Sequence, residues 1–262
     1  MNMFYGSAPV FFVKDLHRSL DYYCDVLGFA RPHLWGDPPN FAMPQREDII
    51  IMLSQPEDPA RIQPREEIWD AYFWVRDARK LYEEMTGNGA IVHHELTYKA
   101  AYGNLEFIIK DPDGYILAFG QGMTENAFYQ DKPEEDAHQQ ETTFLYMCPV
   151  LASSDVGRDI RWYEEKLGFE NVFDSTRYAA GPVNYAVLGR QKLYLHLQFQ
   201  YPQDMTSTDV RIEVKNIQPL FREYLKNGVI EASAMRPKTA WGTNEFGLFD
   251  PSGNRLTFLE DL

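Results

Sequence analysis

Side chains that can bind ligands alternate with aliphatic side chains in two short segments of the second half of the sequence. Tyr194, His196 and Gln198 alternate with leucines in QKLYLHLQ, and Asp209 and Arg211 alternate with Val and Ile in TDVRIEV. Because successive residues of a β-strand point to opposite faces, each segment has one aliphatic face and one polar face. Imidazole, carboxylate and guanidinium groups can bind a small molecule by hydrogen bonds and charge. The first two can also bind a metal ion.

The first half of the sequence has an aromatic face at the corresponding place. Asp70, Tyr72 and Trp74 share one face of the segment DAYFWV, and Ile116 and Ala118 belong to the same predicted face. Aromatic rings suit a flat or conjugated ligand, and polar groups supply directional hydrogen bonds. The rings of Tyr72 and Trp74 can instead fill the interior as ordinary core, and both interpretations stay open.

The elements that carry these residues occur twice. The segment DLHRSLDYYCDVLGF at 15–29 matches DVGRDIRWYEEKLGF at 155–169, and AYGNLEFIIKDPDGYILAF at 101–119 matches AWGTNEFGLFDPSGNRLTF at 240–258. A third pair, 75–90 and 214–229, lies between them at nearly the same offset. Three blocks in one order indicate an internal duplication. We predict domains at 1–120 and 144–262, joined by an acidic, Gln-rich linker at 121–143.

Each repeat is predicted to contain the same plan twice. A strand at 10–13 leads into a helix with apolar residues at helical spacing, which Gly28 ends, and further strands follow at 47–53 and 192–199. The strand at 71–75 also leads into a helix, and the sequences D-P-D-G and D-P-S-G make turns into a last strand. The fold class is therefore α+β, with four strand-helix-three-strand modules.

Composition excludes several classes of function. A net charge of −14 argues against nucleic acid and anionic lipid as partners, because both need Lys and Arg to neutralise phosphate. The two cysteines, Cys24 and Cys148, have no spacing typical of a disulfide framework or a zinc site. The N-terminal segment lacks the features of an export signal or membrane span, so we expect a cytoplasmic protein. No Gly-rich phosphate loop or nucleophile elbow occurs.

The repeated motifs resemble those of the vicinal oxygen chelate superfamily, which includes glyoxalases, bleomycin-resistance proteins and extradiol dioxygenases. The pattern runs from D-x-x-R-S and L-G-F to W/Y-G-x-x-E-F and D-P-x-G-N, and both halves carry most of it, with Asp159 in place of the Ser and Tyr115 in place of the Asn. The resemblance implies two tandem domains of βαβββ modules, which form a pseudo-dimer with curved mixed sheets. It leaves the function open, because the superfamily includes metal-dependent isomerases, dioxygenases, fosfomycin-inactivating transferases and metal-free drug-binding proteins.

For enzymes, the resemblance implies a divalent metal held by His, Gln or Glu at four strand positions. At those positions the first repeat has Ala8, Met52, Asp70 and Ala118, and the second has Cys148, His196, Asp209 and Thr257. Ala118 and Thr257 thus replace the usual final Glu. If ligands are mixed from the two repeats, Cys148, His196 and Asp70 form one set with three donors. We predict no metal cofactor, and these three residues are the candidate ligands for a divalent metal.

The resulting hypothesis is a protein that binds a small cationic or aromatic molecule without metal, in clefts between its two repeats. Tyr102 and Trp241 precede the penultimate strands, where each ring could cover the pocket or anchor the loop. The predicted ligand-binding residues are Asp70, Tyr72, Trp74, Tyr102, Cys148, Tyr194, His196, Asp209, Arg211, Trp241 and Thr257.

Two other functions stay open, and no catalytic residue is assigned. One is a metal-dependent lyase or dioxygenase that uses the remnant Cys, His and Asp site. The other is a regulatory or scaffold module that acts through protein contacts. We expect either a monomer, as a pseudo-dimer, or a homodimer.

Overall fold

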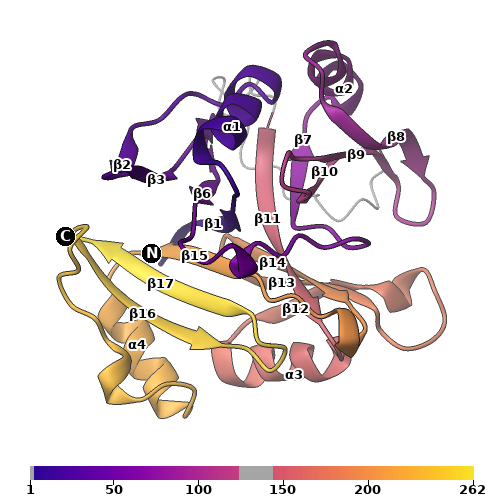
Figure 1. The fold of residues 1–262 in the computed structure, drawn as a ribbon. Helices are drawn as coiled ribbons and strands as arrows, with labels where there is room; N and C mark the ends of the chain where they lie inside the picture. The colour runs from indigo at the N-terminus through magenta and orange to yellow at the C-terminus, as the bar shows by residue number, and fades with distance from the viewer. Residues whose placement is uncertain (1–2, 124–143) are drawn as a thin grey trace, which may run out of the picture. The chain divides into compact units, whose positions relative to one another are not determined.

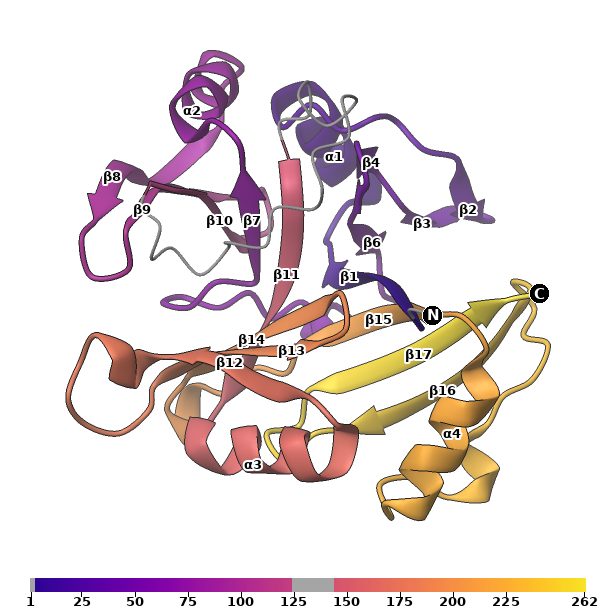
Figure 2. The same ribbon diagram turned by 180° about the vertical axis from the view of Figure 1, so that it is seen from behind.

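The computed structural model describes residues 3–123 and 144–262, and its elements are labelled in Figures 1 and 2. The chain divides into two compact units. The first-repeat unit is Val10–Cys148, and the second-repeat unit is Met1–Pro9 with Pro149–Leu262. Strands β1 (Phe4–Phe12) and β11 (Phe144–Ser153) contribute residues to both units. Most of the predicted linker, residues 124–143, lies outside the described residues, and β10 continues to Gly122.

The first-repeat unit contains two modules. In the first, the end of β1 runs parallel to β6, which is followed in the sheet by β3 and β2. In the second, the order is β7, β10, β9, β8, and the start of β11 lies beside β7. The further elements of the first module are α1 (Leu16–Asp21), the π-helical turn Tyr22–Val26, β2 (Leu34–Gly36), β3 (Pro39–Ala42), β4 (Gln45–Arg46), β5 (Ile49–Ile50), β6 (Met52–Ser54) and the 3-10 turn Pro59–Arg61. Those of the second are β7 (Ala71–Val75), α2 (Ala78–Gly87), β8 (Ile91–Lys99), β9 (Asn104–Lys110) and β10 (Ile116–Gly122).

The second-repeat unit follows the same plan. The end of β11 runs parallel to β14, next to β13 and β12, and β15 runs parallel to β17, next to β16. In the fourth module an isolated bridge at Arg236 stands where the other modules have a further strand. The further helices and strands of the second-repeat unit are α3 (Val156–Leu167), β12 (Glu170–Asp174), β13 (Tyr185–Arg190), β14 (Leu193–Phe199), β15 (Asp209–Val214), α4 (Ile217–Lys226), β16 (Thr243–Phe249) and β17 (Arg255–Asp261). Short 3-10 turns lie at Ser175–Arg177, Pro202–Asp204 and Ala232–Ala234.

Each unit has its own apolar core, and strand alternation decides which side chains enter it. In β7, Ala71, Phe73 and Val75 belong to the core, and α2 contacts strands β8 to β10 of the same module. In β14 and β15 the aliphatic residues of the alternation are buried in the second core, as predicted. The helices described are all too short or too polar to cross a membrane.

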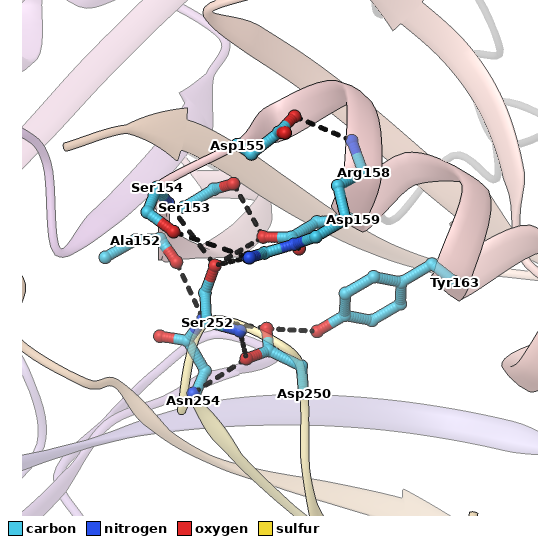
Figure 3. A network of polar contacts seen from close by, with 10 residues as sticks. All are labelled: Ala152, Ser153, Ser154, Asp155, Arg158, Asp159, Tyr163, Asp250, Ser252 and Asn254. Atoms are coloured by element: carbon cyan, nitrogen blue, oxygen red, sulfur yellow. Dashed lines mark hydrogen bonds and ion pairs between the residues drawn. The ribbon is translucent and has the colours of Figure 1, made fainter. Parts of the chain in front are cut away.

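The two repeated sequence motifs contact each other through a buried tyrosine. The carboxylate of Asp250, in the D-P-S-G turn, accepts hydrogen bonds from the backbone N–H groups of Ser252 and Asn254 at 3.0 and 2.8 Å. The hydroxyl of Tyr163, on α3, donates to the same carboxylate at 3.0 Å (Figure 3). In the first repeat, Tyr23 donates to Asp111 in the same way at 3.1 Å. The helix motif and the turn motif therefore form one structural unit.

A second contact between helix and turn has exchanged its residue types between the repeats. In the first repeat, the hydroxyl of Ser19 on α1 donates to Asp113 in the turn at 2.7 Å. In the second, the carboxylate lies on the helix and the hydroxyl in the turn, where Ser252 donates to Asp159 (Figure 3). Each repeat thus keeps one donor and one acceptor at this contact.

We predict that this exchange can be reproduced in the first repeat. Ser19→Asp alone places two carboxylates together, and Asp113→Ser alone removes the acceptor, so each should lower the free energy of unfolding by about 1–3 kcal/mol. The double variant should recover at least half of the summed loss. A double-mutant cycle of urea unfolding measures this coupling, and strictly additive losses would contradict it.

The buried turn carboxylates also predict a dependence of stability on pH. Burial raises the pKa of Asp111 from 3.8 to about 7, and that of Asp250 to about 6. Because these folded-state values lie above the unfolded value, the stabilisation is complete below about pH 4 and is lost as pH rises toward 7. Asp111→Asn keeps the acceptor oxygen without the charge, so its unfolding free energy relative to wild type should increase from pH 4.5 to 7.5. Asp250→Asn should show the same sign with a smaller change.

Candidate functional site

The face of the first-repeat sheet that points away from the core carries polar and aromatic side chains. Glu106 on β9 lies opposite Gly120 on β10, which lies beside Trp74 on β7. The next row of the same face consists of Ile108, Ala118 and Tyr72. Because paired residues of neighbouring strands share a face, these six residues form one surface with five side chains. We call it the Glu106 face.

Glu106 is the centre of a buried hydrogen-bond network. Its side chain is 1% exposed, and its Oε2 accepts a 2.9 Å bond from the hydroxyl of Tyr72. The hydroxyl of Tyr102 donates to both oxygens at 3.3 and 3.4 Å, and the Nδ2 of Asn104 donates to the Tyr72 hydroxyl at 3.0 Å. The Oδ1 of Asn104 is buried and has no hydrogen-bond partner among the described residues.

The network depends on a glycine in the strand between Tyr72 and Glu106. A Cβ atom at Gly120 would lie 1.8 Å from the hydroxyl oxygen of Tyr72. Only a residue without a side chain lets the phenol pass over β10 and reach the carboxylate. Gly120 is therefore a position of close approach, which explains a glycine within a strand.

The environment of Glu106 disfavours its negative charge. Burial raises the pKa of this carboxyl, and the hydrogen bond from Tyr72, the charge of Lys99 and the hydrogen bond from Tyr102 oppose the shift. The immediate donors are neutral hydroxyl groups. An ionised Glu106 would thus be stabilised by a positive charge beside it.

Aromatic rings surround the phenol of Tyr72. The centroids of Trp69 and Trp74 each lie 5.0 Å from that of Tyr72, at interplanar angles of 55° and 52°. Tyr72 and Trp74 are buried and Trp69 is half-buried. These flat surfaces can stack on a conjugated or planar cationic group.

The second repeat has a glutamate at the equivalent position, with different partners. Glu245 on β16 is fully buried, and its Oε2 accepts a 2.7 Å bond from the guanidinium of Arg211. The guanidinium of Arg236 lies 3.1 Å from Oε1. At an offset of 139 residues, Tyr72 corresponds to Arg211 and Thr97 corresponds to Arg236. The carboxylate at this equivalent position therefore has two cationic partners in the second repeat, at Glu245, and hydroxyl partners in the first, at Glu106.

The structure brings three predicted ligand-binding residues together around Glu106 or in contact with its partners, namely Tyr72, Tyr102 and Trp74. Asp70 lies just before β7, where its Oδ2 accepts a 2.7 Å bond from the backbone N–H of Ile116 and its Oδ1 lies 3.5 Å from the Nε of Arg65. Burial raises the pKa of Asp70 to about 6, against the effect of Arg65. Both oxygens of Asp70 thus have partners within the fold.

The other predicted residues lie in different surroundings. Arg211 shares a row with Thr257, which is buried, and Asp209 is paired with Arg255 in the strand register. The ring of Tyr194 packs over Gly189, where an added Cβ would lie 2.9 Å from it. His196 is buried and its Nδ1 lies 2.9 Å from the hydroxyl of Tyr185. Trp241, the counterpart of Tyr102, is 62% exposed.

The residues at the metal positions implied by the superfamily do not fit a metal. Cys148 is buried, and this burial raises the pKa of its thiol well above the ordinary range. Burial lowers the pKa of His196 to about 3, which keeps its imidazole neutral, but Asp70 is already engaged by Arg65 and Ile116. Within residues 3–123 and 144–262, no three His, Cys, Asp or Glu side chains lie close enough to hold an ion.

Sequence reasoning missed Glu106 and Glu245, although both stand in the repeated motif. The available signal was their alternation with core residues. Phe107 and Phe246 enter the two cores, so the preceding glutamate in each strand must point to the opposite face. The prediction of an aromatic face in the first repeat therefore lacked its buried carboxylate.

The difference between the two glutamates predicts that the same substitution has effects of different size. Glu106→Gln removes a charge that lacks a counter-ion and keeps an acceptor for Tyr72, so the free energy of unfolding should change by less than about 1 kcal/mol. Glu245→Gln leaves two guanidinium groups without their carboxylate and should lower it by about 2 kcal/mol or more. Urea unfolding of both variants measures the difference, and equal losses would disprove it.

Comparisons with known proteins show which family model and which solved structures this chain resembles. Residues 8–119 match the model of the Glyoxalase/Bleomycin resistance protein/Dioxygenase superfamily. No curated protein matches the sequence significantly. Glyoxalase I from Zea mays is 18% identical and superposes with a TM-score of 0.68, covering 99% of this chain and 92% of that chain. A putative dioxygenase from Bacillus subtilis is 13% identical with a TM-score of 0.64, covering 100% of this chain and 86% of that one.

At these identities the two structures show a shared fold, and they agree with the tandem α+β modules predicted from the sequence. Residues 8–119 thus match the Glyoxalase/Bleomycin resistance protein/Dioxygenase superfamily, and the chain as a whole shares the fold of these two solved structures.

Proposed function

We propose that this protein binds a small organic molecule without a metal ion, and that the Glu106 face forms part of its binding site. The observation that carries this proposal is a buried carboxylate whose donors are neutral hydroxyl groups, on a face with clustered aromatic rings. A buried carboxyl group needs donors or a counter-ion to keep its charge. A ligand with a positive or hydrogen-bond-donating group supplies what the fold leaves out.

Two further features support binding over metal-assisted chemistry. Ala118, at the position of the usual final metal ligand, has no donor atom and lies in the same row as Tyr72. The aromatic cluster of Trp69, Tyr72 and Trp74 offers stacking surfaces, which suit an aromatic ligand and need no metal.

We predict that an aromatic compound stabilises the metal-free protein. After treatment with a chelator, a thermal-shift screen should include aromatic cations, neutral aromatics and aromatic anions, each with and without Zn²⁺, Ni²⁺ or Mn²⁺. A compound present at 100 times its Kd stabilises the folded state by about 2.7 kcal/mol and raises the melting temperature accordingly. Added metal should not change the Kd.

The variants of this experiment locate the site. Tyr72→Phe and Trp74→Phe should each weaken binding at least threefold, measured by quenching of tryptophan fluorescence. Trp162→Phe is the matched control, since Trp162 lies on α3 in the second-repeat unit. The proposal fails if no compound shifts the melting temperature, or if binding requires stoichiometric metal.

A further inference from the structure

We propose that the ligand carries a planar cation of the guanidinium or amidinium class, which forms an ion pair with Glu106 as the guanidinium of Arg236 does with Glu245. This inference rests on the proposed function and names the chemical class of the ligand. Its basis is that the second repeat has an arginine beside its buried glutamate, whereas the first repeat has a threonine at the corresponding position.

The two positions correspond in sequence and in strand register. Thr97 on β8 lies directly opposite Glu106 on β9, and Arg236 forms the bridge opposite Glu245 on β16. Residues that are directly opposite in an antiparallel pair place their side chains on the same face. Arg236 therefore reaches Glu245 from the position that Thr97 occupies relative to Glu106.

Threonine does not replace the arginine as a partner of the carboxylate. The hydroxyl of Thr97 donates to the backbone carbonyl of Glu95 at 2.9 Å. Within the described part of the chain, Oε1 of Glu106 accepts only the long 3.3 Å bond from Tyr102. A carboxylate has about four acceptor positions, so Glu106 can take a further pair of strong donors.

A planar cation fits this position better than an ammonium group. Guanidinium and amidinium groups present two parallel N–H donors that match both oxygens of a carboxylate. Their flat faces also stack on aromatic rings, and the Glu106 face contains Tyr72 and Trp74. An ammonium group is compact and strongly hydrated, so its transfer to this surface costs more.

The aromatic residue of the turn before β9 has a different position in the two repeats. Tyr102 is half-buried and contacts Glu106, whereas its counterpart Trp241 is 62% exposed where Arg236 already pairs with the carboxylate. The same turn position thus occurs in two arrangements, with the ring on the glutamate in one repeat and away from it in the other. We infer that the ligand displaces the Tyr102 hydroxyl from Glu106.

Four probes test this inference on the full chain. Benzamidine and phenylguanidine carry the planar cation, benzamide is the neutral analogue of benzamidine, and benzylamine carries an ammonium group. By isothermal titration calorimetry, benzamidine and phenylguanidine should bind at least tenfold more tightly than the other two. In Glu106→Gln this preference should disappear while the affinity for benzamide stays within about twofold.

A substitution that restores the arginine supplies the second test. Thr97→Arg should place a guanidinium beside Glu106, raise the melting temperature and weaken benzamidine binding at least tenfold. Gln63→Arg adds the same charge at an exposed position and should leave the melting temperature and the affinity for benzamidine unchanged.

The outcomes separate this inference from the proposed function. If benzamide binds as tightly as benzamidine, or if Glu106→Gln keeps the preference, the planar-cation inference is wrong and the proposed function stands. If Thr97→Arg folds and binds benzamidine like wild type, the cation does not bind beside Thr97 and Glu106, and the inferred location is wrong. If none of the four probes and no compound of the wider aromatic screen binds, the proposed function fails as well.

Discussion

A carboxyl group removed from water has to receive hydrogen-bond donors or a positive charge, and both units of this protein are organised around that requirement. Asp111 and Asp250 receive backbone N–H groups of the turn and a tyrosine hydroxyl from the helix. These bonds attach the last strands to the helices. Glu106 and Glu245 impose the same requirement on the opposite sheet face, where Arg211 and Arg236 meet it for Glu245 and we propose that a ligand meets it for Glu106.

Comparison of the two repeats shows which donors and acceptors can be exchanged at each buried carboxylate. At the helix–turn contact, Ser19 with Asp113 and Asp159 with Ser252 have exchanged donor and acceptor without losing the bond. At the sheet face, the second repeat has two arginines where the first has Tyr72 and Thr97, so the donors differ in charge. The first contact conserves the chemistry of the pair. The second changes it, which is why we assign structural importance to one and binding to the other.

Much of the fold was readable from the sequence, because periodicity and turn chemistry act locally. The alternation in β14 and β15, the extent of β7 and the stop at Gly28 follow from strand geometry and from the positive φ of a glycine after a helix. The partners of the site residues were not readable. Arg65 reaches Asp70 from an irregular segment, and the phenol of Tyr72 reaches Glu106 only because residue 120 on the intervening strand lacks a side chain. Such contacts depend on register between strands, which the local pattern does not contain.

The same physical requirement explains why the Glu106 face suits an organic cation better than a metal ion. A divalent ion has to replace most of its hydration shell with several donors that converge on one point. The Glu106 face has one carboxylate, and its neighbours are phenol, indole and Ala118. A guanidinium or amidinium group is weakly hydrated, forms two bonds to a single carboxylate and tolerates aromatic rings on its faces. The alanine at residue 118 and the buried glutamate at residue 106 therefore favour our proposal that this face accepts a charge brought by the ligand.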